Sequence, residues 1–167
     1  MRPTRWIVLA LALLAGAAQA QLSTPDPDWK EMEAPPPAAL RTEGLVPIEI
    51  PQSNLRFGVD PASVQVGSDG IVRYVVVATS TSGAVNASYE GIRCNTGEGK
   101  VYARHRAGKG WVPNVGEQWQ SLQQTRNSRH ALVIARNGAC LGSAPNRSAS
   151  QIVRDLGGGV NWRFWNN

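Results

Sequence analysis

The longest alternation of apolar and polar positions lies between Leu55 and Arg104 and is of the β type. Ile71–Thr79 is the strongest predicted strand, and its middle is apolar on both faces, which indicates a central strand covered on both sides. Shorter β-prone runs lie before and after it, and glycine-containing turns separate them at residues 67–70, 80–83 and 95–99. We therefore expect an antiparallel meander in this part of the chain.

The last third of the chain has helical periodicity, with one stretch open to two interpretations. The apolar positions that fit helical spacing are Trp119, Leu122, Ala131, Leu132 and Ala135. A helix through them would end at Asn137-Gly138, whereas a hairpin at residues 128–141 would use the same pair as its turn. We favour the helix. Ser148–Ser150 predicts the start of a second helix over residues 151–156.

These elements predict an α+β fold with one disulfide-linked domain over residues 55–160. We expect an antiparallel meander of four or five strands, with two C-terminal helices packed on one face. Residues 21–54 contain seven of the eleven prolines, which remove backbone donors and fix φ. That segment is therefore predicted to be an extended arm, with an edge strand at residues 45–50. Residues 161–167 form a short aromatic tail.

The first twenty residues have the parts of a secretory signal peptide. Two arginines precede an apolar run from Trp6 to Ala18, and the small residues that follow predict cleavage between Ala20 and Gln21. The apolar run is shorter than the roughly 20 residues that span a bilayer, so we expect no transmembrane segment after cleavage. The mature chain is therefore expected in the periplasm or outside the cell.

Charge is distributed unevenly along the chain. Residues 21–60 hold seven acids and three bases, whereas residues 61–167 hold five acids and twelve bases. This asymmetry indicates either a basic surface for an anionic envelope component or an acidic arm that lies on its own domain. A solvated basic surface without a partner is the simplest interpretation, and we do not expect a nucleic-acid partner.

Cys94 and Cys140 are the only cysteines of the chain. An even number of cysteines in an oxidising compartment predicts a disulfide. A catalytic thiol would need a free cysteine with a low pKa, which export disfavours. We expect a structural disulfide between Cys94 on a strand and Cys140 after the first helix, joining the two layers.

No sequence pattern predicts an enzyme, a metal site or a cofactor. The two histidines lie far apart, and no phosphate-binding glycine loop or nucleophile elbow occurs. Some residue types suit a metal-independent nuclease, in which acid and base groups move protons while cations hold the phosphate. They are Glu90, Arg93, Lys100, Arg104, His105 and His130. We do not favour this hypothesis, because Glu90 and Arg93 point to opposite faces of a regular strand.

Two further hypotheses are non-enzymatic. A binding module for an anionic ligand would use basic groups interleaved with an indole, namely Arg104, His105, Arg106, Lys109 and Trp111. A structural or interaction protein of the cell envelope would instead contact a partner protein with its arm and tail. The sequence favours the second of these, with no ligand or partner identified.

Part of the chain resembles a known family. The most specific block consists of Tyr89, Glu90, Gly91, Ile92, Arg93 and Cys94, and residues 70–77 and 100–103 support it. Over Leu55–Leu156 the chain is similar to the cryptic neisserial protein 1-like family of exported proteobacterial proteins. The resemblance implies an envelope protein of a Gram-negative bacterium. It offers no catalytic residues, because the family has no assigned activity.

Overall fold

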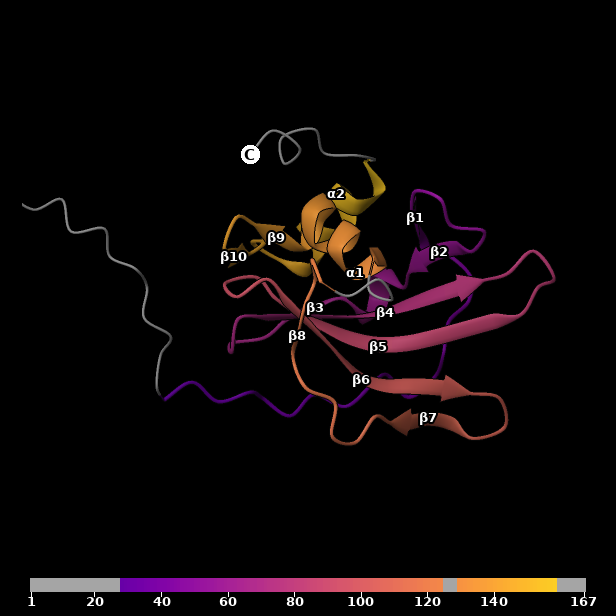
Figure 1. Cartoon of the computed structure of the whole chain (residues 1–167), viewed down its shortest axis with the longest axis horizontal. Helices are drawn as coiled ribbons and strands as arrows, with labels where there is room; N and C mark the ends of the chain where they lie inside the picture. Colours follow the sequence, from indigo (N-terminus) through magenta and orange to yellow (C-terminus); the bar gives the residue numbers. More distant parts are fainter. Residues whose placement is uncertain (1–27, 125–128, 159–167) are drawn as a thin grey trace, which may run out of the picture. The chain divides into compact units, whose positions relative to one another are not determined.

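The computed structural model describes residues 28–124 and 129–158 (Figure 1). The predicted signal peptide and the aromatic tail lie outside the described residues. The chain divides between Lys30 and Glu31, and the sheet and both helices belong to the second unit. No described helix is long and apolar enough to cross a membrane.

An antiparallel sheet of eight strands forms the centre of this unit. The strands are β1 (Val46–Ile48), β2 (Arg56–Val59), β3 (Gln65–Val66), β4 (Ile71–Thr79), β5 (Val85–Arg93), β6 (Glu98–Arg106), β7 (Gly110–Pro113) and β8 (Gln120–Ser121). Their order is β1-β2-β4-β5-β6-β7, with β3 beside β4 and β8 beside β6. The predicted α+β class, the antiparallel sheet and the edge position of β1 are confirmed, while β7 and β8 were not predicted.

The C-terminal part contains two helices and a small hairpin. Helix α1 (Arg129–Ile134) continues as a π-helical segment (Ala135–Ala139), β9 (Cys140–Leu141) pairs with β10 (Ala144–Pro145), and α2 (Ala149–Gly157) follows. The Ser148 hydroxyl caps α2, accepting a hydrogen bond from the Gln151 amide at 3.2 Å, as predicted. The favoured helix is confirmed from Arg129 onward, but it ends at Ala139 rather than at Asn137-Gly138, and the small hairpin lies just beyond it.

The helical prediction is wrong for residues 117–124, which contain no helix and in which Gln120–Ser121 forms a strand beside β6. Trp119 contacts the ring of Tyr102 on one face of the sheet, whereas Leu122 belongs to the core on the other face. A spacing of three residues suits both one face of a helix and opposite faces of an extended chain. The periodicity alone therefore could not separate the two structures.

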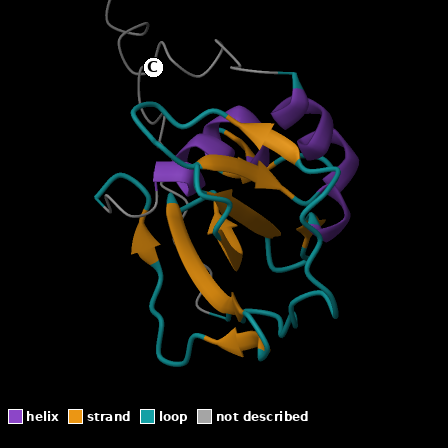
Figure 2. Ribbon diagram, turned by 90° about the vertical axis from the view of Figure 1, so that its right-hand side faces the viewer, coloured by secondary structure: helices purple, strands orange, loops and turns teal. Residues whose placement is uncertain are grey.

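Both helices pack against the same face of the sheet (Figures 1 and 2). This helix face buries a core that includes Val72 and Tyr74 of β4, Ile134 of α1 and Ile152 of α2. The disulfide between Cys94, after β5, and Cys140 of β9 is formed, as the sequence predicted. It joins the end of a central strand to the segment between the helices.

The opposite face, which we call the arm face, is covered by residues 31–45 (Figure 1). Leu40 and Leu45 pack there against a buried cluster that includes Val75 of β4 and Tyr89 of β5. The acidic arm therefore lies on its own domain, which was one of the two interpretations of the charge asymmetry. Because both faces are covered, β4 is buried along Ile71–Val77, as its continuous apolar pattern predicted.

Strand β6 carries one extra residue opposite β5. Tyr89 pairs with Ala103, but the next residue, Glu90, pairs with Val101, so Tyr102 has no counterpart on β5. Such a β-bulge reverses which side chains point to which face beyond it. Tyr102 and Ala103 both join the cluster of the arm face, and the following residue, Arg104, is directed to the helix face opposite Ser88.

Candidate functional site

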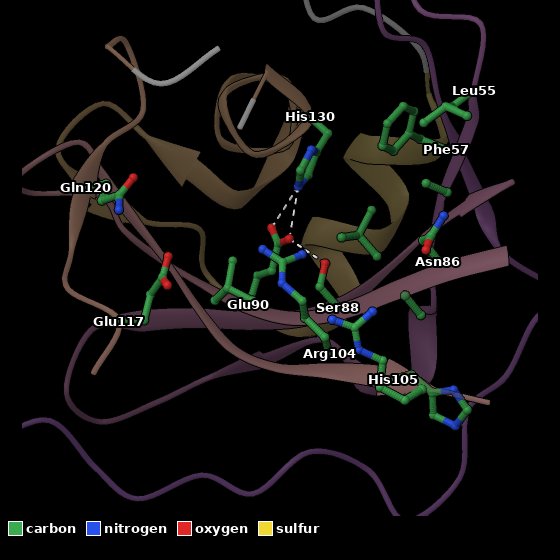
Figure 3. Close-up of a pocket in the computed structure, with 15 residues that line it drawn as sticks. Leu55, Phe57, Asn86, Ser88, Glu90, Arg104, His105, Glu117, Gln120 and His130 are labelled. Atoms are coloured by element: carbon green, nitrogen blue, oxygen red, sulfur yellow. Dashed lines mark hydrogen bonds and ion pairs between the residues drawn. The ribbon is translucent and has the colours of Figure 1, made fainter. Parts of the chain in front are cut away.

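A cleft of about 410 Å³ opens on the helix face between α1 and strands β2, β5 and β6 (Figure 3). Leu55 and Phe57 line one end of it, and Glu117 and Gln120 line the other. Glu90 lies between these ends, directly below the ring of His130. The cleft therefore has an apolar end, a polar end and a buried ionisable pair in its floor.

Glu90 of β5 is only 4% exposed and accepts hydrogen bonds from three side chains. The Ser88 hydroxyl donates to Oε1 at 2.5 Å, the Tyr74 hydroxyl donates to Oε2 at 3.2 Å, and His130 Nε2 lies 3.0 Å from both oxygens. Burial alone would raise the pKa of Glu90, but the charge of His130 and these hydrogen bonds together outweigh it and lower the pKa. The carboxylate is therefore ionised at neutral pH.

His130 is held from two sides. Its ring stacks on Phe57 of β2, with centroids 5.4 Å apart and planes inclined by 15°. Burial and the charge of Arg104 oppose protonation of the imidazole, but the charge of Glu90 and its hydrogen bond outweigh them and raise the pKa of His130. Glu90 and His130 therefore form an ion pair that fixes α1 to the sheet.

Arg104 and Arg106 supply the remaining positive charge of the cleft. Both lie on the helix face of β6 beyond the bulge, and both line the cleft. In Figure 3 the Arg104 side chain extends toward the Glu90 carboxylate. Within the described part of the chain, neither guanidinium has a hydrogen bond or an ion pair. The cleft therefore presents two guanidinium groups that form no ion pair with the described residues around them.

A sequence profile of the CNP1-like family matches residues 24–157. The chain belongs to the CNP1-like family. The matched span contains every described element from β1 to α2, so the resemblance noted in the sequence is confirmed. No curated protein and no solved structure matches the chain.

The family motif divides between the two faces of β5. Glu90 and Ile92 point to the helix face, followed by Cys94, whereas Tyr89 and Arg93 point to the arm face. Gly91 lies under the side chain of Tyr102, where an added Cβ would be 2.8 Å from the ring carbon Cε2 and from the hydroxyl oxygen. The glycine therefore permits a close contact that any larger residue would disturb. In this CNP1-like chain the motif supports the fold on both faces and contributes Glu90 to the cleft.

The predicted basic and aromatic cluster is also divided between the faces. Arg104 and Arg106 line the cleft, whereas the side chain of His105 points away from Glu90 (Figure 3). His105 meets Trp111 edge to face at 5.3 Å, and Trp111 packs against the core of the arm face. Lys109 lies in the turn between β6 and β7. The structure therefore brings the two arginines together without the indole.

The residues of the nuclease hypothesis are separated in the same way. Glu90, His130 and Arg104 meet in the cleft. Arg93 instead lies over the ring of Trp119 at 4.6 Å, and Lys100 pairs with Glu31 at 3.1 Å on the arm face. Among the described residues, no three His, Cys, Asp or Glu side chains are placed to hold a metal ion.

Several residues that line or support the cleft were not identified from the sequence, among them Ser88, Phe57 and the Glu90 partner Tyr74. Ser88 could have been found by alternation, because it lies two residues before Glu90 and points to the same face. Tyr74 is the residue directly opposite Glu90 in the register of β4 and β5. Phe57 approaches His130 only through the packing of α1 on β2, and no local pattern signals that contact.

Proposed function

We propose that this CNP1-like chain is an exported, non-enzymatic interaction domain of the cell envelope that binds an anionic ligand in its cleft. The observation that supports this proposal is the pair of arginines, Arg104 and Arg106, which line the cleft without an ion-pair partner among the described residues. An anion in the cleft would supply that partner. The proposal combines the two non-enzymatic hypotheses by placing the interaction in a defined cleft.

The contacts of Glu90 and His130 support a non-enzymatic role. A general base needs a lone pair within reach of the proton that it removes. Here three donors occupy the Glu90 carboxylate, and the Ser88 hydroxyl donates to Glu90 rather than to His130. No activated serine results from this arrangement. The ion pair serves instead to hold the wall of the cleft in place.

The disulfide supports the exported location. Cys94 and Cys140, the only cysteines, are bonded to each other, as suits an oxidising compartment such as the periplasm. The signal-peptide pattern at residues 1–20 is independent support for export.

Retention of the purified, oxidised mature chain on an anionic matrix tests the proposal. The variant Arg104→Glu/Arg106→Glu should lose salt-sensitive retention. The matched control is Arg147→Glu/Arg154→Glu, which changes the net charge by the same amount as the cleft variant. Both control residues are exposed; Arg147 precedes α2 and Arg154 lies on it. The control should elute close to the wild type. Equal retention of the two variants would contradict recognition through the cleft.

A further inference from the structure

We propose that the ligand of this cleft is a small amphipathic monoanion, whose carboxylate pairs with Arg104 and whose apolar body packs against Leu55 and Phe57. The inference rests on the proposed anion-binding function and narrows the ligand to one chemical class. Two observations support the inference. They are the balance of charge in the cleft, and the fact that Leu55, Phe57 and Arg104 line the same cleft.

The charges that line the cleft leave room for one negative charge. Glu90 and His130 neutralise each other at 3.0 Å. In the sum of charges, the negative charge of Glu117 offsets the positive charge of one of the two arginines. The Glu117 carboxylate already accepts a hydrogen bond from the side-chain amide of Asn114 at 2.7 Å. The lining side chains therefore carry a net charge of about one positive unit with His130 protonated. A dianion such as a phosphate monoester would also face the ionised Glu90 in the floor.

The shape and lining of the cleft favour a small ligand with an apolar body. A volume of about 410 Å³ lies in the lower part of the range typical of small-molecule sites. Leu55 is 39% exposed although it is a large apolar residue, and it lines the cleft together with Phe57, Val76 and Ala78. Covering such a surface releases water and favours binding of an apolar group.

The same geometry disfavours an anionic polymer. Single-stranded polymers bind grooves in which aromatic side chains stack on successive units. The indole of Trp111, which the sequence places beside the arginines, lies against the core of the arm face. Phe57, the aromatic residue in the cleft, is already stacked on His130. The cleft therefore offers a guanidinium and an aliphatic wall rather than a stacking platform.

Isothermal titration of the oxidised mature chain with three probes tests this inference. Decanoate has both a carboxylate and an alkyl chain. Acetate has the carboxylate without the long alkyl chain, and decyltrimethylammonium has the alkyl chain with a positive charge in place of the carboxylate. Decanoate should bind, and acetate should bind at least about ten-fold more weakly, because it lacks the apolar body. Decyltrimethylammonium should not bind measurably, because its charge is repelled by Arg104 and Arg106.

Two substitutions separate the two parts of the site. Arg104→Gln should weaken decanoate binding by at least about ten-fold, the size expected for loss of a charged hydrogen bond. Leu55→Ser should weaken decanoate binding and leave acetate binding unchanged. Both residues are exposed, so thermal unfolding should show that both variants fold. Arg147→Gln is the matched control for charge and should bind decanoate like the wild type.

Three outcomes would overturn the inference. If acetate binds as tightly as decanoate, the cleft recognises charge alone, and the proposed anion-binding function remains. If decyltrimethylammonium binds like decanoate, the cleft is merely apolar, and the role of Arg104 is wrong. If neither decanoate nor acetate binds, the inference and the proposed function both fail.

Discussion

Each face of the sheet contains a buried ion pair, and the surroundings of the two pairs differ. On the arm face, Arg73 and Asp69 are 2.6 Å apart with side chains 2% and 1% exposed. The backbone of Met32 closes this pair, since its carbonyl accepts from Arg73 and its amide donates to Asp69. On the helix face, the Glu90–His130 pair instead forms the floor of an open cleft. One pair is sealed by the arm, and the other remains beside solvent.

The difference between the faces indicates which of them is available for recognition. On the arm face, Arg73 pairs with Asp69, Arg93 lies 3.5 Å from Glu98 and Lys100 lies 3.1 Å from Glu31. These three cations are thus paired within the chain, and two of them, Arg73 and Lys100, also contact the arm. The guanidinium of Arg104 on the helix face has no such partner among the described residues. Similar residue types therefore stabilise the fold on one face and line the proposed binding site on the other.

The largest loss of stability is expected when the buried acid on the arm face is removed. Asp69→Asn leaves the Arg73 guanidinium buried without its carboxylate, which should cost about 3–5 kcal/mol of the free energy of unfolding. Urea denaturation at pH 7 measures this loss. A loss below about 1 kcal/mol, the size typical of exposed pairs, would show that this face is not sealed.

A smaller effect is expected for Glu90→Gln on the helix face. The variant keeps the shape of the side chain but loses the charge that His130 faces, which should cost about 1–3 kcal/mol near pH 6. Urea denaturation from pH 4 to pH 9 measures both this cost and its dependence on pH.

The two pairs should also differ in how they respond to pH. Because the pKa of His130 is raised, its contribution is complete below the ordinary value of 6.5 and is lost as pH rises through the raised pKa. Because the pKa of Glu90 is lowered, its contribution is complete above 4.5 and is lost as pH falls through the lowered pKa. The pair therefore stabilises the fold most between pH 4.5 and 6.5.

Wild-type stability should consequently decline above pH 6.5, and Glu90→Gln should show a smaller decline. Burial raises the pKa of Asp69, but the hydrogen bonds from Arg73 and Met32 outweigh it and lower the pKa. Asp69 should therefore lose its contribution to the free energy of unfolding only below pH 3.8. His105→Gln removes the other histidine and should keep the wild-type decline. An equal decline in Glu90→Gln and the wild type would contradict the role of the ion pair.

The smallest expected effect concerns the arm. Glu31→Gln weakens the contacts with Lys100 and Trp119, which should cost about 0.2–1 kcal/mol because these side chains are partly exposed. The segment 31–45 should also be cleaved faster by protease at low concentration. Glu33→Gln changes the same charge at an exposed residue two positions away and should behave like the wild type. Equal cleavage rates in both variants would show that Glu31 does not hold the arm.

The sequence predicted elements well where a β-prone run was uninterrupted. Ile71–Thr79 was predicted with both of its ends correct, because β-branched residues fill it and glycine turns flank it. The cap at Ser148 and the disulfide were predictable because each depends on a residue type with a specific chemistry. These features are local, or follow from the number of cysteines.

The faces of β6 could not be predicted from alternation. Counting from Lys100 places Tyr102 and Arg104 on the same face, but the bulge at Tyr102 moves Arg104 to the other face. The contact between Phe57 and His130 is likewise tertiary, since it joins β2 to α1. The cleft therefore depends on an irregular strand and on helix packing, neither of which has a local signal.

The most direct test of the difference between the faces is to record amide chemical shifts of the ¹⁵N-labelled mature chain during titration with decanoate. The shift changes should concentrate on the cleft, at Leu55, Ser88 and Arg104, while the amides of Arg73 and Lys100 stay unchanged. Shifts concentrated at Arg73 and Lys100, or no shifts at saturating decanoate, would contradict the claim that the helix face carries the binding site.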